Sequence, residues 1–452
     1  MSKELKGKIG LEIHSYVVTK EKLFCGCKAS REKGLKENVN ICPICTGMPG
    51  AKPMLPNKSA VEKAVQIGLM LGCKINKKLV WQRKHYDWPD LPKGYQNTLS
   101  GPHAFPVGVK GNFGGVGIWS MHLEEDPAAW DPDSGCVDYN RSGLPLVEII
   151  TAPDFSSADE VVLWLKKLVH ALNYLKAIDS NAGIKADVNV NIPGRSERVE
   201  IKNINSIESI GRAIKYELER QMKEGGVRET RRFDDVKGKT IRMRGKEVAE
   251  DYRFISDPDL RDIIIDKKFV DGEKKKLPEG PEEKLKKLIK KYKIGKVDAE
   301  VLAKNIDVVE FFEKVAEKVN AKFVLPWVTI ELLRFLNYNK TSLDKVDLKV
   351  EHFVALLKLV KSGKITELQG KQLLNKFYPK SFMPKKFEGK ISGRKELEEI
   401  AKKVVEKNRR VVEDYKAGNE NAFNFLMGQI MKETDRRADF KIAREVLKGL
   451  LK

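Results

Sequence analysis

The sequence predicts an α+β protein in which a mixed α/β part is followed by all-helical parts. In residues 1–280, short β-branched runs alternate with glycine- and proline-rich turns, the pattern of strands joined by tight connections. The segment Leu277–Pro281 (Leu-Pro-Glu-Gly-Pro) then supplies residues that interrupt helices and strands. Beyond it, apolar residues recur at helical spacing almost to the C-terminus. A chain of 452 residues that is 41% hydrophobic can form about three domains with real cores.

We expect these domains at residues 1–280, 281–385 and 386–452, with the second boundary near a further proline-containing break at Met383–Lys386. In the first domain, helical periodicity predicts helices at Ser59–Leu71, Ser157–Leu175 and Ile207–Glu224. Later it predicts helices at Glu282–Tyr292, Asp298–Ala303, Val308–Asn320, Thr329–Leu336 and Val350–Ser362, and two or three more in Arg394–Lys452, one opening near Asn419. Ser157 and Glu160 have the spacing of a capping box.

Net charge is unevenly distributed along the chain. The total is +21, and residues 281–452 alone carry 39 basic and 25 acidic side chains. Such a field attracts a polyanion without sequence preference, and nucleic acid is the usual one. The alternative is a lysine-rich, solvated helical surface of a heat-adapted protein. No run approaches the roughly 18 apolar residues of a membrane span, and the first residues lack the apolar core of a signal peptide, so we expect a cytoplasmic protein.

Four of the six cysteines form two close pairs, Cys25-Gly26-Cys27 and Cys42-Pro43-Ile44-Cys45. Two such pairs separated by fourteen residues suit a tetrahedral Cys₄ zinc knuckle. A disulfide is not expected in a cytosolic chain. Because four thiolates would fill the coordination shell, the zinc is expected to be structural. Cys73, in an apolar run, is expected in the core.

Acidic side chains and one imidazole recur in or beside strand-like runs. The four segments are Gly10–His14, Met121–Asp126, Pro145–Ile150 and Ala186–Asn189. Alternate residues of a strand share a face, so Glu12 and His14 should point the same way and could begin a divalent-metal site. Glu124, Glu148 and Asp187 could add the oxygen ligands that Mg²⁺ prefers. The alternative is a set of surface strands with scattered acids.

Other kinds of site are absent from the sequence. The dense glycines from Gly108 to Gly117 are not followed by Gly-Lys-Ser/Thr, so they predict tight turns and no phosphate-binding Walker loop. If the chain handles ATP, metal ions must hold the phosphates. There is no Gly-x-Ser-x-Gly elbow and no cysteine in a hydrolase-like context, so nothing predicts hydrolysis of glutamine.

Taken together, these segments resemble the B subunit of tRNA-dependent amidotransferases (the GatB/GatE family), over almost the whole chain. The matching stretches are Gly10–His14, Cys42–Gly50, Arg83–Gln96, His122–Asp126, Val137–Arg141, Pro145–Ile150, Pro153-Asp154, Asp187–Asn189, Glu200–Ser206, Glu229–Asp234, Asp251–Asp259, Trp327–Leu333 and Gly418–Lys432. The resemblance implies a "cradle" domain with a kinase-like site, a helical domain and a small YqeY-like helical tail. The related E subunit has a large insertion after the cradle. In this sequence the segment between Asp259 and the helical region is too short for such an insertion, which favours the B type.

The resemblance also implies a reaction. ATP would phosphorylate the side-chain carboxylate of Asp-tRNA(Asn) or Glu-tRNA(Gln), and ammonia would displace the phosphate to form the amide. Phosphorylation turns a poor acyl donor into a good one, and Mg²⁺ offsets the charge between the two anions. The ammonia would come from a separate glutaminase A subunit, in a heterotrimer with a small C subunit. The basic helical domains would grip the tRNA.

Carried over residue by residue, the family's metal and ATP ligands fall on Glu12, His14, Glu124, Glu148 and Asp187, and the sequence leaves open whether Glu124 or its neighbour Glu125 is the ligand. Lys202 and Arg231 are candidates for phosphate contact. The run His85-Tyr86-Asp87-Trp88 departs from the family's pattern and leaves the role of His85 open. Two rival hypotheses remain: a noncatalytic, zinc-stabilised tRNA-binding scaffold, and a stand-alone ligase that uses free ammonia.

Overall fold

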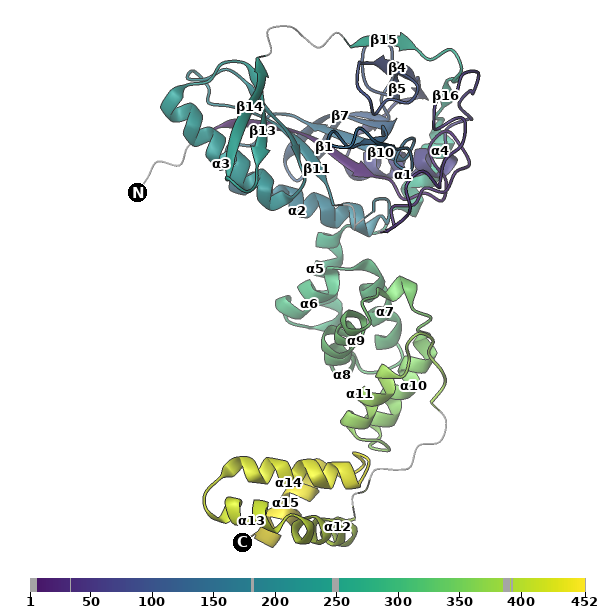
Figure 1. Ribbon diagram of the computed structural model, residues 1–452. Coiled ribbons are helices and arrows are strands. Elements are labelled where there is room, and N and C mark those ends of the chain that lie inside the picture. The colour runs from purple at the N-terminus through teal and green to yellow at the C-terminus, as the bar shows by residue number, and fades with distance from the viewer. Residues whose placement is uncertain are drawn as a thin grey trace. The chain divides into compact units, whose positions relative to one another are not determined.

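The structure, a computed structural model, describes residues 6–32, 34–179, 183–245, 252–384, 391 and 393–451. It divides into two compact units, Met1–Gly280 and Pro281–Lys452. The first is built on a large mixed sheet and the second is helical (Figure 1), so the predicted α+β class is confirmed.

The first unit contains all the strands of the described residues. They are β1 (Lys8–Tyr16), β2 (Lys74–Ile75), β3 (Lys78–Leu79), β4 (Gln82–His85), β5 (Gln96–Thr98), β6 (Gly108–Phe113), β7 (Val116–Glu125), β8 (Ala129–Trp130), β9 (Val137–Asp138), β10 (Pro145–Thr151), β11 (Lys185–Asn191), β12 (Val199–Ile204), β13 (Glu229–Asp234), β14 (Lys239–Gly245), β15 (Arg253–Ser256) and β16 (Ile263–Ile264). Its helices are α1 (Lys58–Met70), α2 (Ala158–Tyr174), α3 (Ile207–Glu224) and α4 (Lys267–Lys276).

Strands that are distant in sequence are neighbours in the main sheet. The order is β14-β13-β12-β11-β1-β10-β7-β5-β4-β15, with β6 pairing β7 and β2. The N-terminal strand β1 is central and runs antiparallel to both β10 and β11. Thus β1, β7, β10 and β11, which carry the acidic segments, lie side by side.

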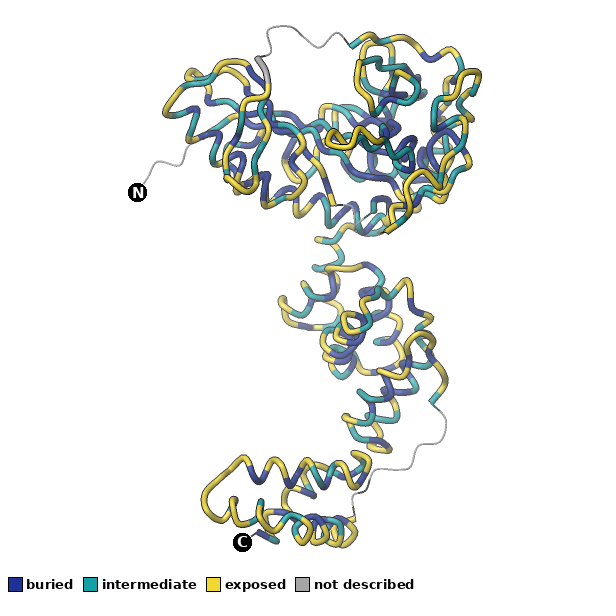
Figure 2. The backbone as a smooth tube through the Cα atoms, in the orientation of Figure 1, coloured by how far each residue is buried: buried dark blue, intermediate teal, exposed yellow. Residues whose placement is uncertain are grey.

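The two faces of this central sheet differ in polarity. On β1, the side chains of Ile9, Leu11 and Ile13 belong to the main hydrophobic core, which also includes apolar residues of α2 and α3. The alternate residues, Glu12 and His14, point to the opposite face. Figure 2 shows that the central strands of this unit consist largely of buried residues, with more exposed residues around them. The apolar face therefore binds the helices, and the polar face is left for chemistry.

Three helices of the first unit, α1, α2 and α3, begin within one residue of the predicted positions, whereas α4 was not predicted. The side chain of Ser157 caps α2 by accepting the N–H of Glu160 at 3.3 Å, and Ser206 caps α3 in the same way at Ser209. The reciprocal half of the expected capping box differs, since the Glu160 carboxylate accepts the N–H of Ser156 at 2.8 Å. Such caps satisfy N–H groups that the first turn leaves unpaired.

The glycine-rich segment is a β-hairpin, and only part of it is a turn. Gly114 and Gly115 have φ of 59° and 87° and connect β6 to β7, as tight turns require. Gly111 lies within β6, where a Cβ atom would be 2.6 Å from the Cys73 sulfur. It is glycine because another segment passes close by, which periodicity in the sequence does not reveal.

The second unit contains two separate hydrophobic clusters. Its helices are α5 (Pro281–Tyr292), α6 (Lys296–Ala303), α7 (Ile306–Ala316), α8 (Ala321–Pro326), the π-helix η1 (Trp327–Leu332), α9 (Leu333–Tyr338), the short 3₁₀ helix η2 (Leu343–Lys345), α10 (Val350–Lys361), α11 (Glu367–Asn375), α12 (Arg394–Lys407), α13 (Arg409–Lys416), α14 (Glu420–Glu433) and α15 (Phe440–Leu451). One cluster extends from Leu288 to Phe377 and the other from Ile391 to Leu451. The boundary expected at residues 385 and 386 lies outside the described residues. No helix in the described ranges is both long and apolar enough to cross a membrane.

Candidate functional site

A cavity of about 450 Å³ opens on the polar face of the central sheet. Five predicted ligands line it, together with one of the two predicted phosphate contacts: Glu12, His14, Glu124, Glu148, Asp187 and Lys202. The four acidic segments of the sequence therefore meet in one place.

Strand register explains why these side chains meet. Glu12 on β1 is paired with Asp187 on β11, and His14 on β1 is paired with Glu148 on β10. Directly opposed residues of antiparallel strands have side chains on the same face. On the far side of β10, Glu124 of β7 is paired with Leu146 and joins the same face.

The ligand atoms form two adjacent groups. In one, an atom each of His14, Glu124 and Glu148 lies within 4.8 Å of the others, and the His14 Nε2 atom is 3.6 Å from a Glu148 oxygen. In the other, oxygens of Glu12, Asp187 and Glu200 lie within the same distance of one another. Such spacing suits carboxylates that share a cation. Glu200 was missed as a candidate because the sequence paired it only with Lys202.

Burial of so many carboxylates perturbs their ionisation. Burial, followed by repulsion from Glu148, raises the pKa of Glu124 to about 7. Burial also raises the pKa of Glu148, and burial with repulsion from Glu148 and Asp187 raises that of Glu12. Carboxylates crowded in this way gain most from a bound cation, so the donor set fits a hard divalent metal.

The two phosphate-contact candidates have different positions. The Lys202 Nζ atom lines the cavity, 3.2 Å from a Glu200 oxygen and 3.6 Å from an Asp187 oxygen. Arg231 does not line it: its guanidinium pairs with Glu229 at 2.7 Å and with Glu217 of α3 at 3.6 Å. The geometry therefore gives Arg231 a place in a buried ion-pair network and does not support the predicted phosphate contact.

The structure separates Glu124 from Glu125. The Glu124 side chain lines the cavity and accepts a hydrogen bond from the Thr98 hydroxyl at 2.9 Å. Glu125 forms an ion pair with Lys93 and accepts the N–H of Asn97 at 2.9 Å. Adjacent residues of a strand point to opposite faces, so only Glu124 is available to a ligand in the cavity.

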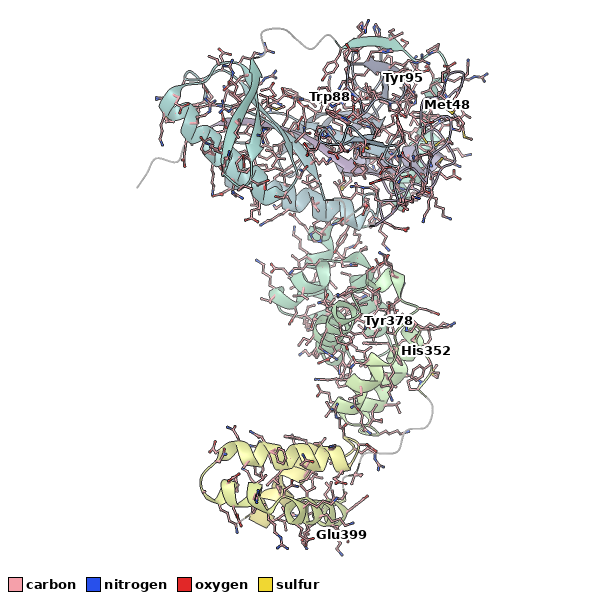
Figure 3. The ribbon with its side chains drawn as sticks, in the orientation of Figure 1. Met48, Trp88, Tyr95, His352, Tyr378 and Glu399 are labelled. Carbon is pink, nitrogen blue, oxygen red and sulfur yellow. The ribbon has the colours of Figure 1, made fainter. Side chains whose placement is uncertain are left out.

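The cavity also contains cations that the sequence did not single out. Lys84, Arg141 and Lys185 line it beside the acidic groups. Lys84 belongs to β4, in the segment of mixed basic and aromatic residues whose Trp88 and Tyr95 are labelled in Figure 3. Alternation along this short strand could have indicated that Lys84 faces away from its neighbours.

Those neighbours of Lys84 have structural partners. Arg83 pairs with Asp257 at 2.9 Å and with Asp259 at 2.8 Å. The ring of His85 lies against that of Tyr95, with centroids 5.4 Å apart. His85, whose role the sequence left open, does not line the cavity.

The four clustered cysteines form a second candidate metal centre. The sulfur atoms of Cys25, Cys27, Cys42 and Cys45 all lie within 4.8 Å of one another, and all four are free thiols. This arrangement fits a tetrahedral metal such as zinc. Cys73 is buried in the main core, as predicted.

Comparison with known proteins agrees with this geometry. Residues 7–271 match the family model of the GatB/GatE catalytic domain, and residues 310–451 match that of the GatB domain. The chain is 43% identical to the B subunit of the aspartyl/glutamyl-tRNA(Asn/Gln) amidotransferase of Methanocaldococcus jannaschii, over 99% of this chain and 98% of that protein. It is 41% identical to the protein of the same name from Methanococcus aeolicus, with both chains fully covered, and 40% identical to that from Methanopyrus kandleri, over 98% of each. The chain belongs to the GatB family.

Proposed function

We propose that this chain is the B subunit of an aspartyl/glutamyl-tRNA(Asn/Gln) amidotransferase, a ligase that uses ATP and glutamine-derived ammonia to amidate mischarged tRNA. The observation that carries the proposal is the meeting of Glu12, His14, Glu124, Glu148 and Asp187 at one cavity. A noncatalytic scaffold does not need five metal-ligand residues from four strands to meet at one cavity, so the scaffold hypothesis is not favoured.

In the proposed reaction, an oxygen of the substrate's side-chain carboxylate attacks the γ-phosphorus of ATP and ADP leaves. Ammonia then attacks the acyl carbon, loses a proton and expels phosphate. Bound Mg²⁺ would supply charge neutralisation between the carboxylate and the phosphates. Glu12, His14, Glu124, Glu148 and Asp187 would hold it.

The cations of the cavity have a complementary task. Lys202 and Lys84 carry positive charge next to the acidic groups. The charge of Lys202 partly offsets the rise in the pKa of Glu12 and Glu148, and that of Lys84 partly offsets the rise in the pKa of Glu148. We infer that their ammonium groups contact phosphate oxygens and stabilise the charge that develops during transfer. Positioning of two anions against each other is the main catalytic need in such a step.

Ammonia requires a partner, because the sequence contains no nucleophile system for hydrolysing glutamine. We propose an amidase A subunit and a small C subunit as the other members of a heterotrimer. The basic unit Pro281–Lys452 would bind tRNA(Asn) or tRNA(Gln) through phosphates and shape. Because tRNA is the substrate, we place the protein in the cytoplasm, and we assign zinc with a structural role to the cysteine cluster.

The test replaces Glu12 and Glu148 with alanine, separately, in the assembled complex. We expect ATP-dependent amidation of mischarged tRNA to be lost while tRNA binding is kept. Full activity of both variants would overturn the enzymatic proposal and would favour the noncatalytic scaffold instead. Amidation by the purified chain alone, from ammonium and without partners, would instead favour the stand-alone ligase.

A further inference from the structure

A fully buried lysine lies next to the cysteine cluster. Lys22 is 1% exposed, and it is among the largest completely buried side chains of the described residues. Its Nζ atom donates to the Cys45 sulfur at 3.4 Å and to the carbonyl oxygen of Tyr139 at 3.0 Å. Among the described residues, no carboxylate forms an ion pair with it.

A buried ammonium group needs a negative partner, because removal from water is costly for an unpaired charge. Here the nearest candidate is the sulfur of Cys45. Four thiolates around one Zn²⁺ carry a net charge of −2, so a neighbouring ammonium lowers the excess negative charge and donates a hydrogen bond to sulfur. Such outer partners orient metal ligands and tune their affinity.

The same lysine connects the cluster to the segment 139–143. Besides the bond from Lys22 to Tyr139, the Ser142 hydroxyl donates to the carbonyl oxygen of Cys45 at 2.7 Å. The N–H of Leu23 donates to the carbonyl oxygen of Gly143 at 2.8 Å. Three hydrogen bonds thus join the cysteine segments to this short stretch of chain.

Arg141 lies in the middle of that stretch, and its side chain lines the cavity. Its Nε atom donates to the carbonyl oxygen of Pro127 at 2.9 Å and lies 3.3 Å from an Asp126 oxygen. Its position is therefore set by the cavity wall on one side and by the cysteine cluster on the other.

We propose that Lys22 neutralises the metal–thiolate cluster and, through Tyr139, couples it to the segment that holds Arg141 in the cavity. Lys22 is a positioning residue in this proposal, and Arg141 is the group that meets the substrate or nucleotide. The kinetic half rests on the proposed function, whereas the metal half does not.

The first test measures zinc affinity of the full chain by competition with a chromophoric chelator. Lys22→Met keeps an unbranched chain one atom shorter than that of lysine and removes its charge, and we expect the zinc affinity to fall 10- to 100-fold. The control is Lys28→Met, because Lys28 lies next to Cys27 but pairs with Glu32 at an exposed site. An unchanged affinity in Lys22→Met, or an equal loss in both variants, would overturn the proposal.

The second test uses kinetics of the assembled complex saturated with zinc. If the cluster acts through Arg141, Lys22→Met and Arg141→Ala should each raise KM for one of the substrates by at least several-fold. Adding Lys22→Met to Arg141→Ala should then raise that KM no further, while zinc affinity still falls. Fully additive effects would exclude the coupling to Arg141.

Ser142→Ala provides a second variant should Lys22→Met fail to fold even in excess zinc. It removes one of the three connecting hydrogen bonds and leaves the ammonium in place. We expect a zinc affinity within about twofold of wild type and a raised KM that disappears in the Arg141→Ala background. A wild-type KM would refute the coupling. If neither the wild-type complex nor any variant amidates tRNA, the proposed function fails. The zinc measurement on Ser142→Ala still tests whether Lys22 stabilises the metal site. A large loss of zinc affinity with the Lys22 ammonium in place would contradict that part of the proposal.

Discussion

Glu124→Gln should make the metal-free protein more stable at pH 8, although it removes a proposed metal ligand and should weaken metal binding. Burial and repulsion from Glu148 raise the pKa of Glu124 from its ordinary value of 4.5 to about 7. A folded-state pKa above the unfolded one means that the ionised form destabilises the fold. Stability should therefore fall as pH rises from about 4.5 to about 7, and the full penalty should be present at pH 8.

The size of this penalty follows from the pKa difference. A rise from 4.5 to about 7 corresponds to about 3 kcal/mol. Glutamine removes the charge and can still accept the hydrogen bond that the Thr98 hydroxyl donates to Glu124 at 2.9 Å. We expect a gain of up to about 3 kcal/mol at pH 8 and almost none at pH 4.5, where Glu124 itself is largely protonated.

The assay is urea unfolding without magnesium or nucleotide, at pH 8 and pH 4.5, followed by tryptophan fluorescence. Five of the six tryptophans lie in Met1–Gly280, so the signal reports mainly on that unit. Glu125→Gln is the matched control: Glu125 pairs with Lys93 and accepts the N–H of Asn97, so its loss should destabilise by about 3 kcal/mol. A Glu124→Gln variant that is no more stable than wild type at pH 8 would refute the reasoning.

Three further predictions concern the cavity cations, the ion-pair network and the helical unit. Lys202→Met should tighten Mg²⁺ binding in the absence of nucleotide and weaken ATP binding, because the Lys202 ammonium lies within 3.6 Å of carboxylate oxygens of Asp187 and Glu200. Calorimetry measures both affinities, and changes in the same direction would contradict this prediction. Arg231→Met should lower the stability of the first unit by about 3 kcal/mol, because it leaves buried Glu217 and Glu229 with one cation fewer. KM for ATP should stay within about twofold of wild type, and a large rise would support the predicted contact of Arg231 with phosphate. Replacing the exposed pair Arg409 and Arg410 with glutamine should reduce the salt slope of tRNA binding by about 1 to 2; a slope equal to that of wild type would remove this end of α13 from the interface.

Some parts of the site could be predicted from sequence because they depend on local geometry. Strand alternation alone places Glu12 and His14 on one face. The helix Ile207–Glu224 begins and ends where its periodic apolar residues indicate.

Other parts depend on contacts between distant segments. The closeness of Asp187 to Glu12 follows from the pairing of β11 with β1, and no spacing in the sequence gives that strand order. For the same reason, the sequence could not tell that Arg231 has Glu217 of α3 as a partner. The predicted helix Thr329–Leu336 is a π-helix followed by an α-helix, because apolar periodicity does not distinguish hydrogen bonds to the fourth residue from those to the fifth.

The acidity of the cavity gives its own argument for a metal-dependent anion site. The protein as a whole carries +21, and its proposed substrates are two polyanions, yet carboxylates outnumber lysine and arginine side chains, six to four, among the residues that line the cavity. Such a face repels phosphate until a cation intervenes, and the raised pKa of Glu124 expresses the same cost in the absence of one. Selection for stability alone would replace these residues with neutral ones, as Glu124→Gln tests. We therefore propose that their presence on four adjacent strands reflects a divalent ion, which would turn the least favourable part of the fold into a place where two anions could react.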